Sequence, residues 1–97
     1  MDRNFIIDTL KSNKGYIKIT FHIKDMALFG SYSRDEQAQK SDIDILVEFE
    51  DQYKTFKNYM ALKLYLENLF NSKIDLVSKT AIKDRLKEKI LKEILNV

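Results

Sequence analysis

The sequence predicts a small mixed β-sheet flanked by helices, in the α/β (α+β) class. Short apolar segments rich in β-branched residues, typical of strands, alternate along the chain with longer amphipathic segments typical of helices. The 97 residues contain no Pro, only two Gly and no repeat or linker-like tract. We therefore expect a single domain over residues 1–97, with one hydrophobic core.

The chain is expected to begin with a helix over residues 3–13 that ends at the sequence Asn13-Lys14-Gly15. Residues 16–23 leave two alternatives open, because their β-branched content favours a strand while a short helix also fits. The apolar stripe of the first helix is formed by Phe5, Ile6 and Leu10, with Ile7 beside it.

Two strands are expected next, on either side of a polar segment. The first covers residues 25–29 and is stopped by Gly30, and a short helical segment follows at 31–36. The second strand, at 43–49, has the strongest pattern because its β-branched apolar run is nearly continuous.

Residues 55–70 predict a helix whose apolar side chains cover more than one narrow stripe. Packing on two sides within a small core explains that coverage best, and a surface for a protein partner is the alternative. A third strand is expected at 73–77, and then a last helix that is capped by Ser78 or Thr80 and runs to about residue 95.

Composition and charge exclude several classes of protein. Lys and Arg number 17 against 15 Asp and Glu, without a dense basic block, so direct nucleic-acid binding is not expected. The absence of Cys excludes disulfides and thiolate metal sites and fits a reducing compartment. Neither a membrane-spanning run nor a signal peptide is recognisable, so we expect a cytoplasmic protein.

Two carboxylates at the start of the strongest strand need an explanation, because buried charge is costly without compensation. Asp42 and Asp44 lie two residues apart, so a strand would project both from one face, opposite Ile43 and Ile45. A hard divalent cation such as Mg²⁺ would relieve their repulsion. Acids that simply face water are the alternative for this pattern alone.

Other polar residues extend this candidate site. Asp75 interrupts the third predicted strand and could join the two acids if the strands are neighbours, as a metal ligand or proton acceptor. Backbone N–H groups at Gly30 and Ser31 could hold a phosphate, and Arg34 could reach the same group. Ser41 is expected mainly to cap the strand entry, with a direct phosphate contact as the alternative.

Taken together, these motifs resemble those of a minimal nucleotidyltransferase (MNT) domain of the DNA polymerase β-like superfamily. The matching stretches are "ALFGSYSR" at 27–34, "SDIDILVEFE" at 41–50 and "KIDLV" at 73–77, and the final "RLKEKILKEI" resembles the closing helix of that family. The chain departs from the family pattern at Asp35, where many relatives have Gly.

The resemblance implies a polymerase β-like nucleotidyltransferase fold that binds a nucleoside triphosphate, with ATP as substrate. It implies that Gly30 and Ser31 hold the β- and γ-phosphates, and Arg34 and Ser41 remain the further candidate nucleotide-binding residues. It also implies that Asp42 and Asp44 hold two Mg²⁺ ions, and that Asp75 completes the catalytic triad as a candidate metal ligand and helps to activate the incoming hydroxyl.

Small members of this family resemble antitoxins of HEPN/MNT toxin–antitoxin pairs. The expected function is therefore the Mg²⁺-dependent transfer of AMP from ATP to a hydroxyl, such as a tyrosine of a cognate HEPN ribonuclease toxin, with a possible hetero-oligomer of the two proteins. Two alternatives stay open: a non-catalytic antitoxin that masks its toxin by binding, and an enzyme that modifies small molecules such as aminoglycosides. The sequence gives neither the base preference nor the acceptor.

Overall fold

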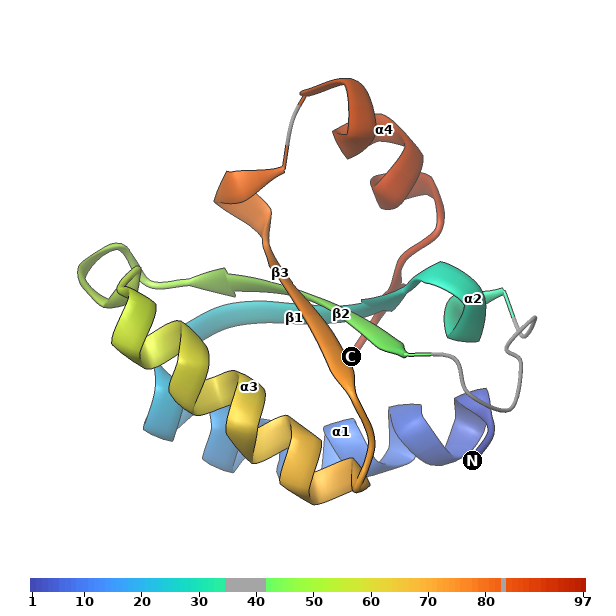
Figure 1. The fold of residues 1–97 in the computed structure, drawn as a ribbon, viewed down its shortest axis with the longest axis horizontal. Helices are drawn as coiled ribbons and strands as arrows, with labels where there is room; N and C mark the ends of the chain where they lie inside the picture. The colour runs from blue at the N-terminus through green and yellow to red at the C-terminus, as the bar shows by residue number, and fades with distance from the viewer. Residues whose placement is uncertain (35–41, 83) are drawn as a thin grey trace.

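Helices and strands alternate along the chain, and the strands form a mixed sheet (Figure 1). The computed structural model describes residues 1–34, 42–82 and 84–97, with the backbone alone at 84–86. The described elements are α1 (Arg3–Phe21), β1 (Ile23–Phe29), α2 (Gly30–Ser33), β2 (Ile43–Phe49), α3 (Phe56–Phe70), β3 (Ile74–Ser78), α4 (Asp84–Lys92) and β4 (Leu95–Asn96), with 3-10 turns at Asp51–Tyr53 and Lys79–Ala81.

The sheet has the strand order β3-β2-β1-β4. Strand β1 is antiparallel to both β2 and β4, whereas β2 and β3 are parallel. A parallel pair requires a long crossover, which α3 provides between β2 and β3. The expected small mixed sheet flanked by helices is thereby confirmed.

Helix α1 is longer than expected, because it passes through Gly15 and ends only at Phe21. Asp2 caps its start by accepting a hydrogen bond from the Phe5 N–H, and His22 ends it in the left-handed conformation. Burial of a stripe on the later turns outweighs the local stop signal. The buried stripe of α1 consists of Ile6, Leu10, Ile17 and Phe21, whereas Phe5 is exposed.

Among the described helices, none is long and apolar enough to cross a membrane.

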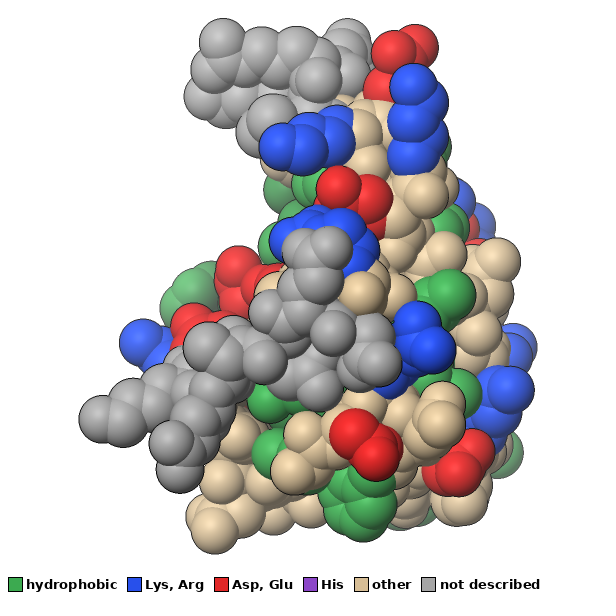
Figure 2. All heavy atoms as spheres, turned by 90° about the vertical axis from the view of Figure 1, so that its right-hand side faces the viewer, with side chains coloured by type: hydrophobic (Ala, Val, Ile, Leu, Met, Phe, Trp, Pro, Cys, Tyr) green, Lys and Arg blue, Asp and Glu red, His purple; other side chains and the backbone are tan. Residues whose placement is uncertain are grey.

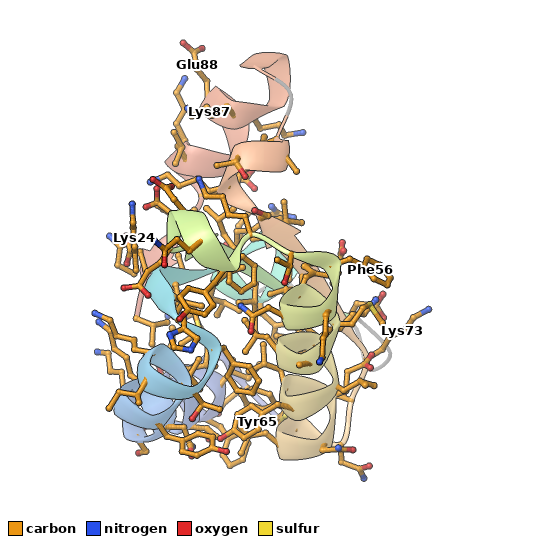
Figure 3. The ribbon with its side chains drawn as sticks, turned by 90° about the vertical axis from the view of Figure 1, so that its left-hand side faces the viewer. Lys24, Phe56, Tyr65, Lys73, Lys87 and Glu88 are labelled. Atoms are coloured by element: carbon orange, nitrogen blue, oxygen red, sulfur yellow. The ribbon has the colours of Figure 1, made fainter. Side chains whose placement is uncertain are left out.

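Helices α1 and α3 cover one face of the sheet, and α4 lies over the other (Figure 1). Alternating residues of β2 divide between two apolar clusters, with Ile45 in the larger one and Leu46 in the smaller. Most apolar residues of α3 contact the larger cluster, and the helix packs against both α1 and β3. Phe56 and Leu64 are exposed, and Phe56 points away from the helix into solvent (Figure 3).

The C-terminal region differs most from expectation. Helix α4 starts at Asp84, after a 3-10 turn rather than directly at a Ser78 or Thr80 cap, and ends at Lys92 instead of residue 95. A short strand, β4, follows and pairs with the edge of β1. Two residues carry no periodic pattern, so only the pairing itself reveals this strand.

The remaining boundaries lie close to those expected. Strand β2 is confirmed at 43–49, and β3 is shifted by one residue to 74–78. The helical segment predicted at 31–36 is observed at 30–33, and its last two residues lie outside the described part of the chain.

Candidate active site

Strand β2 presents its acids on the face opposite the main core. Ile43 and Ile45 are fully buried against α1 and α3, so Asp44 between them projects from the other face. Asp42 immediately precedes the strand and is exposed, while Asp44 is half-buried. The alternation along β2 therefore places the Asp44 carboxylate on one face of the sheet and the core residues on the other, as the sequence predicts.

Asp75 lies directly beside Asp44, because β3 pairs with β2 in the register Asp44↔Asp75. The condition that the two strands be neighbours is therefore met. The pKa of Asp44 is raised to about 6, mainly by burial and then by the charge of Asp75, a hydrogen bond between the two carboxyl groups and the charge of Asp42. The positive charge of the Arg34 guanidinium lowers the pKa of Asp44 in part.

This arrangement fits a metal ion that is completed by other ligands. Among the described residues, no three His, Cys, Asp or Glu side chains stand close enough to form a ready-made metal cage. Mg²⁺ is usually held by only one or two carboxylates, together with water and substrate phosphates. The adjacent Asp44 and Asp75 carboxyls, whose repulsion a cation would relieve, supply such a donor set.

The Gly30 turn is pressed against the same acid. Gly30 has a φ of +73°, and a Cβ added there would overlap Asp44 Oδ2 and lie 2.8 Å from Asp44 Cγ. Both the backbone conformation and the close approach therefore require glycine. The Ser33 hydroxyl donates to the Gly30 carbonyl over 2.7 Å, and the Arg34 N–H donates to it over 3.3 Å, which closes the turn.

Arg34 is placed by a residue that sequence reasoning missed. Its Nη1 lies 2.8 Å from Oε2 of Glu93, in the segment between α4 and β4. On the side of the molecule that carries α2 and α4, basic and acidic side chains are interspersed (Figure 2). No local signal could have identified the pair, because 59 residues separate its members in the sequence.

The structure thus brings five predicted residues together at one end of the sheet. Gly30, Ser31 and Arg34 lie in or beside α2, next to Asp44 and Asp75, and the exposed Asp42 stands just before the same strand as Asp44. Ser41 and the family departure at Asp35 lie outside the described residues. The catalytic, nucleotide-binding and metal-binding roles of all these residues remain predictions.

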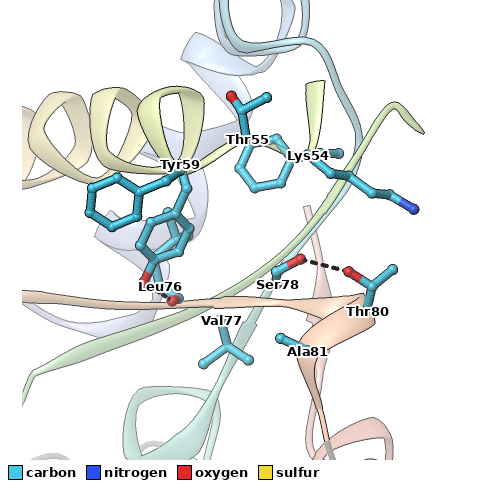
Figure 4. A pocket seen from close by; sticks show the side chains of 10 residues that line it. Lys54, Thr55, Tyr59, Leu76, Val77, Ser78, Thr80 and Ala81 are labelled. Carbon is cyan, nitrogen blue, oxygen red and sulfur yellow. Dashed lines mark hydrogen bonds between the residues drawn. The ribbon is translucent and has the colours of Figure 1, made fainter. Parts of the chain in front are cut away.

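A cavity of about 390 Å³ lies at the other end of β2 and β3, between the start of α3 and the turn after β3 (Figure 4). Its walls include Thr55, Tyr59 and Ser78, and the Tyr59 hydroxyl donates to the Leu76 carbonyl over 2.6 Å. Ser78 lies three residues beyond Asp75, or about 10 Å along the strand. Among the described residues, none of the predicted site residues lines this cavity.

Sequence comparison identifies relatives over most of the chain. Residues 6–97 match the family model of the nucleotidyltransferase domain. A Methanocaldococcus jannaschii protein described as a protein adenylyltransferase is 42% identical over 89 residues, which cover 91% of this chain and 89% of the relative. The protein adenylyltransferase MntA of Thermococcus cleftensis is 35% identical over 88 residues, covering 91% of this chain and 88% of that protein.

Solved structures share the fold. A protein described as a minimal nucleotidyltransferase superposes with a TM-score of 0.86 at 30% identity, over 100% of this chain and 97% of that one. A toxin–antitoxin complex with AMP-PNP gives 0.70 at 27% identity, over 99% and 72%. The complex of tri-AMPylated Shewanella oneidensis HEPN toxin with its MNT antitoxin gives 0.60 at 26% identity, over 97% and 66%.

Proposed function

The chain belongs to the nucleotidyltransferase domain family and is an enzyme of that class, and we propose that it is a Mg²⁺-dependent protein adenylyltransferase acting as an antitoxin. In this proposal it transfers AMP from ATP to a tyrosine of a HEPN-domain toxin. Relatives named protein adenylyltransferases support the reaction. The similar complexes of an AMPylated HEPN toxin with an MNT antitoxin, and of a toxin–antitoxin with AMP-PNP, support the partner and the donor.

The proposed roles divide between the acids and the α2 turn. Asp42, Asp44 and Asp75 would hold Mg²⁺, which would neutralise the triphosphate and the leaving pyrophosphate. Gly30 and Ser31 would contact the phosphates through backbone N–H groups and the serine hydroxyl. Arg34, and Ser41 outside the described residues, would add further phosphate contacts.

The proposed step is an in-line displacement at the α-phosphorus. The acceptor hydroxyl oxygen forms a bond to that phosphorus as the bond to the bridging oxygen of the β-phosphate breaks, and pyrophosphate leaves. Asp75 accepts the proton of the hydroxyl. Positioning and electrostatic stabilisation account for most of such a reaction, so little covalent chemistry is required of the side chains.

The observation that carries this proposal is the pairing of Asp44 with Asp75 beside the Gly30 turn. Asp44 is half-buried, lies against a glycine with positive φ and has the Asp75 carboxyl beside it, so ionisation of both acids together is unfavourable. Such an arrangement is typical of a functional site rather than of a structural ion pair.

The test uses α-labelled ATP, Mg²⁺ and a HEPN-domain protein as the candidate acceptor. We expect label to appear on a toxin tyrosine, identified by peptide mass, and Asp42→Ala to abolish transfer while the circular dichroism spectrum stays native. Asp8→Ala, an exposed acid on α1, is the matched control and should transfer normally. Full turnover by Asp42→Ala would reject the assignment.

Masking of the toxin without catalysis is the second candidate, since Phe56 and Leu64 expose apolar surface on α3 that a partner could cover. The variant Asp42→Ala/Asp44→Ala/Asp75→Ala separates the two functions. Under the enzymatic proposal this variant fails to protect cells that express the toxin. Under masking it protects them as well as the natural sequence does.

A further inference from the structure

Arg34 and Glu93 connect the predicted phosphate site to the C-terminal segment. The Nη1–Oε2 distance is 2.8 Å, and the two side chains are 40% and 26% exposed. The Glu93 carboxylate is therefore partly shielded from water, although Arg34 itself is an exposed residue, whereas the carboxylate of the Lys54–Asp51 pair is 81% exposed. A charge-assisted hydrogen bond in such surroundings restrains a long side chain more firmly than one in open solvent.

The backbone on either side of Glu93 is fixed by the fold. Its N–H donates to the Ile90 carbonyl over 3.0 Å, and Ile90 and Ile94 pack against the cluster on the outer face of the sheet. Beyond Ile94, β4 pairs with β1, and the Val97 N–H donates to the Met26 carbonyl over 3.1 Å. The position of the Glu93 backbone is therefore set by sheet pairing and by the packing of its neighbours.

The Arg34 backbone is equally restrained, because its N–H donates to the Gly30 carbonyl. The guanidinium charge acts on Asp44, so Arg34 lies within electrostatic reach of the acids. A guanidinium carries five N–H donors in a rigid fork, so a bond from one Nη to a carboxylate limits the directions that the other donors can take.

We propose that Glu93 is a positioning residue, which holds the Arg34 guanidinium in the orientation that receives the triphosphate. This inference rests on the proposed function, because it assumes that Arg34 contacts the phosphates. Ordering a long side chain before the ligand arrives removes part of the entropy cost of binding. The C-terminal segment would then contribute to nucleotide affinity through Glu93 without touching the nucleotide.

The test compares Glu93→Gln with Glu88→Gln, a matched control on the outward surface of α4, where Glu88 points into solvent (Figure 3). We expect Glu93→Gln to raise both the KM for ATP and the dissociation constant of AMP-PNP by about two- to tenfold, the cost of one unrestrained side chain. The kcat should change less than about twofold, because Glu93 does not touch the reacting atoms. Glu88→Gln should leave all three constants unchanged.

A double-mutant cycle separates positioning from a structural role. In an Arg34→Ala background, Glu93→Gln should change the dissociation constant of AMP-PNP by less than about twofold, because the residue that it orients is absent. An equal loss of affinity in both backgrounds, or an unchanged KM in Glu93→Gln alone, would overturn the inference. If the natural protein neither binds AMP-PNP nor transfers label, the proposed function itself fails, and the inference fails with it.

Discussion

Gly30 and Asp44 occupy one small space at the end of β1. The positive φ of Gly30 and the overlap of an added Cβ with the Asp44 carboxylate leave no room for any other residue. The opposite case is Gly15, which lies in the middle of α1 with no atom within 4 Å of an added Cβ. The two glycines of the chain therefore serve different purposes, and the same substitution should affect them in opposite directions.

Gly30→Ala should lower the free energy of unfolding by more than about 2 kcal/mol, because alanine adds both left-handed strain and a steric clash. Transfer activity should fall with it, since the turn and Asp44 move apart. Urea unfolding measures the first effect and label transfer the second. A fully active, equally stable Gly30→Ala variant would contradict the described turn.

Asp44 makes the stability of the metal-free protein depend on pH. Its pKa rises from 3.8 to about 6 on folding, so the folded state is penalised once the carboxyl ionises. This destabilisation of the folded state is absent below about pH 4, grows between pH 4 and 6, and is complete above pH 6.

Asp44→Asn should therefore be more stable than the natural protein at pH 7.5 in a chelator, because the amide cannot ionise. The difference should shrink towards zero as the pH falls to 4. Urea unfolding at several pH values measures it. A stability difference that does not vary with pH would show that the carboxyl is not destabilised by its surroundings.

Helix α1 shows how packing decides where an element ends. Its buried stripe continues on the far side of Gly15 with Ile17 and Phe21, which contact the same core as Ile6 and Leu10. Glycine at an exposed mid-helix position weakens a helix but does not stop one whose next turns bury large apolar side chains.

Gly15→Ala should raise the free energy of unfolding by about 0.5–1 kcal/mol, through higher helix propensity and a less flexible unfolded chain. Activity should not change, since Gly15 is exposed and belongs to α1, which packs on the face of the sheet opposite the acids. Thermal or urea unfolding provides the measurement. Destabilisation would indicate that the helix breaks at this residue, as its local sequence suggests.

At the scale of the whole molecule, the parallel pairing of β2 with β3 brings Asp75 beside Asp44. Because α3 returns the chain to the starting end of β2, Asp75 enters the sheet level with Asp44. The resulting repulsion is present in the folded protein and weak in the extended unfolded chain. A bound cation would therefore stabilise the folded state selectively.

Mg²⁺ should accordingly raise the thermal midpoint at pH 7.5. At a concentration about ten times the dissociation constant, the gain is about 1.4 kcal/mol by mass action. Asp44→Asn and Asp75→Asn should each remove most of this gain, whereas Asp8→Asn should retain it. An equal gain in all variants would assign the effect to ionic strength rather than to a site.

The site motifs could be found in the sequence because each depends on nearby residues. The β-branched run at 43–49 predicts its strand, the period of two separates Asp44 from Ile43 and Ile45, and Gly30 stops the preceding strand. The order of helices and strands follows from the same local patterns. What the pattern could not show is which residues at distant positions meet.

By itself, then, the sequence determined the types of element, the family resemblance and the acids at the strand starts. Only the tertiary structure decided the register Asp44↔Asp75, the continuation of α1 through Gly15, the edge strand β4 and the pairing of Arg34 with Glu93. The physical reason is that local sequence signals and tertiary contacts act over different distances along the chain. Propensity and periodicity act over a few residues, whereas register, helix ends and ion pairs between distant segments depend on which surfaces the folded chain buries together.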